Sequence, residues 1–150
     1  MTSRLLRRTI QFGIPILLAA GLLAAVIPRF LHQYGRSLAK HSLGGLHTIG
    51  SALEAYRSKH GAFPACSGRQ PVQVLESSLV PEFLPQLPKT DVWAHPYLVA
   101  TTPTHYEVWS LGADGVAGPN DFDGPTDDLN SDILFSDGRF ARYPRGLIGQ

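Results

Sequence analysis

The 150-residue chain lacks the residue patterns on which most enzymes depend. It has one cysteine, Cys66, so it cannot form an intramolecular disulfide. No His or Asn near Cys66 has the spacing of an activated thiol, which predicts a partly buried, structural side chain there. We find no Ser-His-Asp set, no glycine-rich phosphate loop and no paired-carboxylate motif. The six histidines show neither the helical pair nor the cysteine spacing of a zinc site. We therefore expect no catalytic activity.

Charge is missing from a long stretch near the start of the chain. No charged residue lies between Thr9 and Pro28, and this apolar run is about as long as a bilayer-spanning helix. Residues 1–8 carry three arginines, which favours a basic leader on the cytoplasmic side and a transmembrane helix over residues 9–28. A cleavable secretory signal has a similar pattern and is the alternative interpretation.

Residues 29–60 continue the helix with amphipathic spacing. Apolar residues recur three and four positions apart, which predicts one apolar stripe along a soluble half-helix. The stripe consists of Leu31, Tyr34, Leu38, Leu46, Ile49, Leu53 and Tyr56. His60-Gly61 followed by Pro64 is a typical helix end.

The rest of the chain, residues 61–150, has room for one small domain. Residues 67–89 are predicted to be an irregular connection with a turn or two of helix within Val72–Val80. Two hairpins follow, Tyr97–Ala100 with Tyr106–Trp109 and Ile133–Phe135 with Arg139–Tyr143, the second closed by an Asp-Gly turn. We therefore predict an α+β fold in which a small antiparallel sheet of about four strands packs on the soluble half-helix. Both tryptophans are expected to pack near this sheet.

The segment from Gly112 to Asp132 contains six aspartates and no Lys or Arg. Several carboxylate and carbonyl oxygens on a glycine-containing loop are typical ligands of Ca²⁺. A solvated acidic loop explains the composition equally well, and the strict EF-hand spacing is missing. From composition alone, both interpretations stay open.

Three further segments are informative together: Ala-Tyr-Arg-Ser-Lys-His-Gly-Ala-Phe-Pro at 55–64, Leu-Pro-Lys-Thr-Asp-Val-Trp-Ala-His-Pro-Tyr at 87–97, and Trp-Ser-Leu-Gly-Ala-Asp-Gly at 109–115. In this order they resemble the major pseudopilin of bacterial type II secretion systems, a type IV pilin-like family. The resemblance runs from about residue 20 to residue 132, and it implies a pilin-like fold. The closing hairpin resembles the Leu-Phe-x-Asp-Gly ending of other pilin-like proteins.

The resemblance also implies a structural Ca²⁺ in the acidic loop. Asp114 and the carbonyl of Leu111 match the family pattern most directly. The loop is longer than usual, so the later ligands are to be found among Asp121, Asp123, Asp127 and Asp128, and we predict the last three of these.

By the same resemblance the chain is a structural subunit that assembles through its hydrophobic helix. Its expected partners are other pseudopilin subunits and the inner-membrane secretion machinery, with no nucleic acid. We expect a single-pass protein of the bacterial inner membrane, with a cytoplasmic amino terminus and a periplasmic domain that forms homo-oligomers if it is processed.

The leader departs from the family pattern. Family members are cut after a glycine followed by Phe-Thr-Leu-x-Glu, whereas Gly13 precedes Ile-Pro-Ile-Leu-Leu and no acidic residue occurs before Glu54. This degenerate leader leaves an alternative open, a membrane-anchored, pilin-like binding module that does not polymerise.

Overall fold

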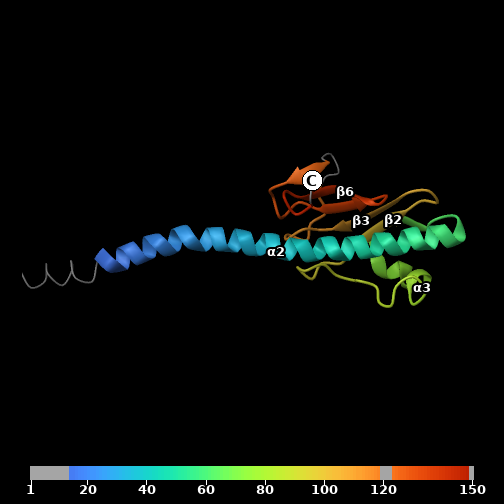
Figure 1. The fold of residues 1–150 in the computed structure, drawn as a ribbon, viewed down its shortest axis with the longest axis horizontal. Helices are drawn as coiled ribbons and strands as arrows, with labels where there is room; N and C mark the ends of the chain where they lie inside the picture. The colour runs from blue at the N-terminus through green and yellow to red at the C-terminus, as the bar shows by residue number, and fades with distance from the viewer. Residues whose placement is uncertain (1–13, 119–122, 149–150) are drawn as a thin grey trace, which may run out of the picture. The chain divides into compact units, whose positions relative to one another are not determined.

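The computed structural model describes residues 14–118 and 123–148 (Figure 1). The chain divides into two compact units, Met1–Gly35 and Arg36–Gln150. Helix α2, Ile14–His60, supplies the described part of the first unit and the first element of the second. The predicted basic leader, residues 1–8, lies outside the described residues.

Within the part of the chain that the structure describes, no helix combines enough length and hydropathy to cross a membrane. The predicted span over residues 9–28 starts before the first described residue, and the transmembrane helix stays a prediction.

The end of α2 follows the sequence signals. Its last turn carries Arg57, Lys59 and His60, whose positive charges suit the carboxyl end of the helix dipole. Gly61 then takes a left-handed φ of 82° and donates its N–H to the Arg57 carbonyl at 2.7 Å. The predicted helix end is therefore confirmed.

A six-stranded sheet forms the body of the second unit, in the order β1-β2-β3-β5-β6-β4. Neighbouring strands are antiparallel except β4 and β6, which run parallel, so the sheet is mixed. The elements after α2 are β1 (Cys66–Pro71), η2 (Val72–Leu75), α3 (Glu76–Leu79), β2 (Leu98–Thr101), β3 (Tyr106–Ser110), β4 (Gly124–Thr126), β5 (Ile133–Ser136) and β6 (Arg139–Pro144).

The predicted α+β fold is confirmed, and the four expected strands are present as β2, β3, β5 and β6. The sheet has six strands where about four were expected, and its β4–β6 pair is parallel in an otherwise antiparallel sheet. Strand β1 lies in the segment expected to be irregular, and β4 lies inside the acidic segment. The short helical turns expected within Val72–Val80 are η2 and α3.

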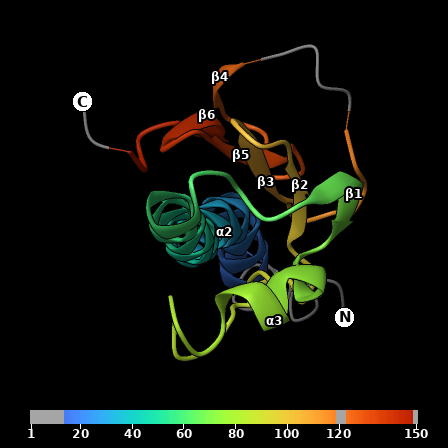
Figure 2. The same ribbon diagram turned by 90° about the vertical axis from the view of Figure 1, so that its right-hand side faces the viewer.

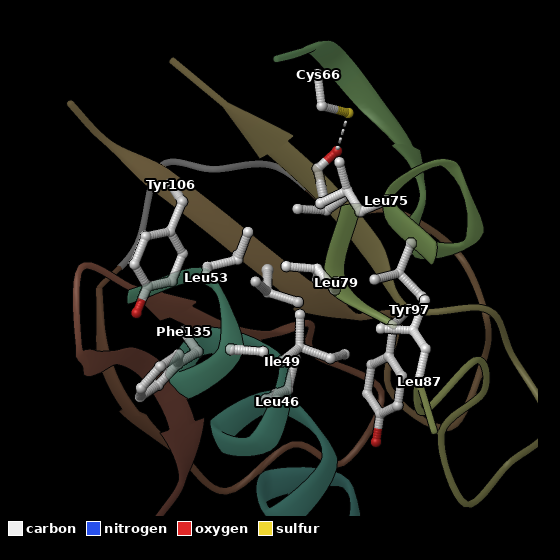
Figure 3. Close-up of a cluster of buried hydrophobic side chains, with 14 of the residues drawn as sticks. Leu46, Ile49, Leu53, Cys66, Leu75, Leu79, Leu87, Tyr97, Tyr106 and Phe135 are labelled. Carbon is white, nitrogen blue, oxygen red and sulfur yellow. Dashed lines mark hydrogen bonds between the residues drawn. The ribbon is translucent and has the colours of Figure 1, made fainter. Parts of the chain in front are cut away.

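One face of the sheet packs on α2, as predicted. Figure 2 looks along α2 and shows the sheet on one side of this helix and the α3 segment on another. Leu46, Ile49 and Leu53 are fully buried and point into the core (Figure 3). Two glycines let the sheet approach closely, since a Cβ on Gly45 would lie 2.2 Å from the Tyr97 hydroxyl and one on Gly50 2.3 Å from the Phe135 ring. Tyr34, placed in the stripe by its spacing, is exposed instead.

Candidate functional site: the acidic loop and its anchoring turn

The turn at residues 90–96 is built around one buried carboxylate, Asp91. Its Oδ1 accepts the backbone N–H groups of Trp93 and His95 at 3.0 and 2.9 Å, and its Oδ2 accepts the Ser110 hydroxyl at 2.6 Å. Both oxygens therefore have donors, which is what makes a buried carboxylate tolerable. The bond to Ser110 joins the turn to the end of β3, where the acidic loop begins.

His95 also connects the turn at residues 90–96 to the acidic loop. Its Nδ1 lies 3.0 Å from the carbonyl oxygen of Gly112, so the ring nitrogen donates. The ring also lies against Gly115, where an added Cβ would come within 2.6 Å of Nε2. Gly112 and Gly115 both have left-handed φ angles, 65° and 69°, which glycine adopts without strain. The Leu-Gly-Ala-Asp-Gly segment thus folds into a turn fitted around His95.

The predicted calcium ligands differ in their exposure. Leu111 is buried, whereas the four predicted aspartates are exposed. Asp114 Oδ1 accepts the Val116 N–H at 2.9 Å, and Asp128 Oδ1 accepts the Asn130 N–H at 3.0 Å.

The other two predicted aspartates lie near basic residues. Asp127 Oδ2 lies 3.3 Å from Arg145 Nε on the surface, and Asp123 lines a shallow depression with Arg139. In the described ranges, 14–118 and 123–148, no three His, Cys, Asp or Glu side chains come together as a metal site. Asp121 lies outside these ranges. The donor chemistry suits Ca²⁺, but the calcium site stays a prediction.

Asp132, which the sequence analysis did not single out, is the buried carboxylate of the loop. It is 1% exposed, and its Oδ2 accepts the Gly118 N–H at 3.1 Å. Its Oδ1 has no hydrogen-bond partner among the described residues. Burial raises the pKa of Asp132 above its usual value; the Gly118 bond and the charges of Arg69 and Arg142 counteract this rise, and Asp114 adds to it.

A sequence signal for this residue exists. Asp132 directly precedes the apolar run Ile133–Phe135. It lies two residues before Leu134, and in an extended chain residues two apart share a face, so Asp132 is expected on the same buried face as Leu134.

The remaining sequence predictions concern Cys66 and the tryptophans. Cys66 is buried, as predicted, and burial raises the pKa of its thiol. Figure 3 shows its Sγ directed at the Val99 carbonyl oxygen, 3.6 Å away. Trp109 is buried in β3, and Trp93 packs partly buried against the core. Both tryptophans therefore pack as predicted.

A family model described as type II secretion system, protein G, matches residues 29–126, more than half of the chain. The chain belongs to this family. The type II secretion system core protein G of Pseudomonas aeruginosa is 28% identical over 119 residues, which cover 72% of this chain and 83% of that protein. The resemblance to the major pseudopilin is therefore confirmed, and with it a structural, non-enzymatic role in secretion.

The family match covers the soluble half-helix, the turn at 90–96 and most of the acidic loop. Strands β5 and β6 follow the matched residues, yet β5 pairs with β3 in the middle of the sheet. The hairpin that resembles other pilin-like proteins is therefore an integral part of this domain.

Proposed function

We propose that this member of the protein G family is a membrane-anchored pseudopilus subunit that assembles through the apolar part of α2. The proposal places the amino terminus in the cytoplasm and the second unit in the periplasm. Its partners would be further pseudopilin subunits, including copies of itself, and the inner-membrane secretion machinery.

One observation carries this proposal. In the first unit, large apolar side chains of α2 are exposed: Leu22 by 68%, Leu23 by 56%, Val26 by 51% and Ile27 by 49%. Burying such side chains is favourable by about 1.5–3 kcal/mol each. They favour a helix surrounded by lipid or by the helices of sister subunits. Family membership adds support, since it assigns the chain to a secretion apparatus.

We also propose that Ca²⁺ stiffens the outer part of the acidic loop. Asp114, Asp123, Asp127, Asp128 and the carbonyl of Leu111 would hold the ion. A bound divalent cation supplies positive charge that offsets the repulsion among these carboxylates. The loop would then present an ordered surface to neighbouring subunits.

Membrane fractionation of the full chain tests the anchoring. We expect the wild-type chain to sediment with membranes, to resist extraction at high pH and to be released by detergent. The double variant Leu22→Glu/Val26→Glu should be lost from the membrane fraction, because charged groups are costly in the bilayer. The matched control is Ser51→Glu/Ser58→Glu, which adds the same charges at exposed positions of the second unit and should leave fractionation unchanged.

The mass and oligomeric state of the membrane-bound protein separate the two candidate functions. A processed chain in oligomers supports the pseudopilus subunit. An unprocessed monomer supports the non-polymerising binding module. Full-length wild-type chain found only in the aqueous fraction would contradict both.

A further inference from the structure

The part of α2 in the second unit leaves one side of the helix exposed. The sheet and the α3 segment lie against other sides of this helix (Figure 2). Exposed residues recur three and four positions apart, so they form one stripe along α2. We call this stripe the outer face of α2, and it consists of Ser37, Lys40, His41, Gly44, His47, Thr48 and Ser51.

The polar groups of the outer face form hydrogen bonds along the helix itself. Thr48 Oγ1 donates to the Gly44 carbonyl oxygen at 2.9 Å, and His41 Nδ1 lies 3.2 Å from the Ser37 carbonyl oxygen. A Cβ added to Gly44 would have open space around it. A neighbouring molecule can therefore approach the helix backbone closely at Gly44.

The outer face lies on a stretch of helix whose formal charge is positive. Between Arg36 and Leu53 the chain contains Arg36 and Lys40 but no Asp or Glu. His41 and His47 add positive charge whenever they are protonated. Among the described residues, Lys40 has no ion-pair partner. The face therefore offers a cation that no described residue of its own chain neutralises.

The acidic loop carries the opposite charge on an exposed surface. Ala113 donates its N–H to the Leu129 carbonyl oxygen at 2.9 Å, which places Asp114 and Asp128 in adjacent segments. Both aspartates are exposed, and neither has a cationic partner among the described residues. Val116 is 63% exposed. We call Asp114, Val116 and Asp128 the loop surface.

We propose that the outer face of α2 binds the loop surface of a second copy of this chain. Lys40 faces the aspartates of the neighbouring copy, and Val116 of that copy fills the open space at Gly44. The inference rests on the proposed assembly of copies and names the surfaces through which their second units meet. One Ca²⁺ cannot neutralise all four predicted aspartates, so the loop stays negative with the ion bound.

Two different surfaces meet in this contact, so the contact is heterologous. Each copy then keeps one free surface of each kind, and the contact either closes into a ring or continues as an open helical filament. Electrostatic complementarity in such a contact fixes register and partner choice more than affinity. The pairing therefore suits a subunit that is added repeatedly to a growing assembly.

Disulfide crosslinking of the full chain in membranes tests this pairing. In a Cys66→Ser background, Gly44→Cys places a thiol on the outer face and Val116→Cys places one on the loop surface. In cells with an active type II secretion system, a chain with both cysteines should form dimers and longer crosslinked products. Each cysteine alone should give monomers, because neither surface meets its own copy. If a variant does not accumulate, Thr48→Cys and Ala117→Cys, also at exposed positions, replace the two.

Two controls test position and charge. Gly44→Cys combined with Thr104→Cys, at an exposed turn outside both surfaces, should stay monomeric. Lys40→Glu, added to the chain with both crosslinking cysteines, should lower the crosslinked yield by more than about fivefold, because like charges then face each other. Ser58→Glu adds a negative charge at another exposed position of α2 and should change the yield by less than about twofold.

Several results would overturn the pairing. Dimers from Gly44→Cys alone would show that α2 meets its own copy. Equal yields in Lys40→Glu and Ser58→Glu would show that charge does not hold the contact. Loss of Lys40→Glu from the membrane fraction, without crosslinks in the parent, would assign the outer face to lipid headgroups.

A crosslink at Val26→Cys separates this inference from the proposed function. Dimers at Val26 with monomers for the paired cysteines would contradict the pairing alone and leave assembly through the apolar part of α2 intact. Monomers in both experiments would contradict the proposed assembly as well.

Discussion

The turn at 90–96 and the acidic loop each contain one buried aspartate, and the two are stabilised differently. Asp91 receives three hydrogen bonds from neighbouring groups of the chain. Among the described residues Asp132 receives one hydrogen bond, and the charges of Arg69 and Arg142 counteract the rise of its pKa. The comparison teaches that Asp91 is satisfied by hydrogen-bond donors on both oxygens, two from the turn itself and one from the end of β3, whereas Asp132 has a donor on only one oxygen among the described residues.

The largest expected effect follows from removing the carboxylate of the turn. Asp91→Ala leaves two backbone N–H groups and the Ser110 hydroxyl without their acceptor, which should cost about 4 kcal/mol of unfolding free energy. Asp91→Asn keeps an oxygen for the N–H groups and should cost less than half as much. Denaturant unfolding of both variants measures the difference. Equal losses would contradict the claim that hydrogen bonds to the Asp91 oxygens stabilise the turn.

Removal of calcium probes the outer part of the loop. If Ca²⁺ binds there, a concentration a hundredfold above Kd stabilises the fold by about 2.7 kcal/mol, and chelator should remove this gain. The unfolding midpoint with Ca²⁺ and with chelator is the measurement, and Asp114→Ala should abolish the difference. An identical midpoint for wild type in both conditions would end the calcium proposal.

Gly115→Ala tests the fit between the loop and His95. The new Cβ would lie 2.6 Å from His95 Nε2, and the alanine would have to keep the left-handed φ of Gly115. We therefore expect a loss of about 2–3 kcal/mol of unfolding free energy. Gly68→Ala is a matched control, because Gly68 has a similar φ of 72° and open space around it. It should lose only about 1 kcal/mol in thermal unfolding. Equal losses would show that contact with His95 is unimportant.

The turn itself contains a strained residue, Ala94, with a φ of 67°. Glycine adopts this conformation freely, so Ala94→Gly should stabilise the fold by about 0.5–1 kcal/mol after the larger backbone entropy of the unfolded chain is subtracted. Ala65→Gly, at an exposed position without a positive φ, should destabilise it slightly. A raised midpoint for the first variant and a lowered one for the second would confirm the strain.

The smallest effect concerns pH. The folded-state pKa of Asp132 lies above its usual 3.8, so the folded chain binds this proton more tightly than the unfolded chain. The contribution of Asp132 to stability should rise as pH falls through the folded pKa towards 3.8, and be lost as pH increases. The difference in stability between wild type and Asp132→Asn, followed from pH 7 to pH 4, measures it. A flat difference would contradict the pKa shift.

The sequence predicted the parts of this domain that depend on local signals. Periodicity, Gly61 and Pro64 placed the end of α2, and alternation with turn residues placed the four central strands. Strand β1 has no such pattern, since Gly68 and Pro71 interrupt it and its pairing with β2 is irregular. Strand β4 is three residues long and pairs with a strand later in the chain, which no local pattern reveals.

The sequence also predicted part of the functional region, as it did for the fold. Its location at 112–132 and the fit of glycines in the turn follow from composition and family resemblance. The burial of Asp132 and the influence of Arg69 and Arg142 on its pKa bring together residues from opposite ends of the domain sequence, so they became visible only in the folded chain. The calcium ligands stay a prediction.

Disulfide crosslinking in membranes tests most directly whether α2 joins sister subunits. In a Cys66→Ser background, Val26→Cys places one thiol on the exposed apolar part of α2, and Thr104→Cys places one at an exposed turn of the second unit. In cells with an active type II secretion system, we expect crosslinked dimers for Val26→Cys and not for Thr104→Cys. Membrane-bound chain that stays monomeric at Val26 would contradict assembly through this helix.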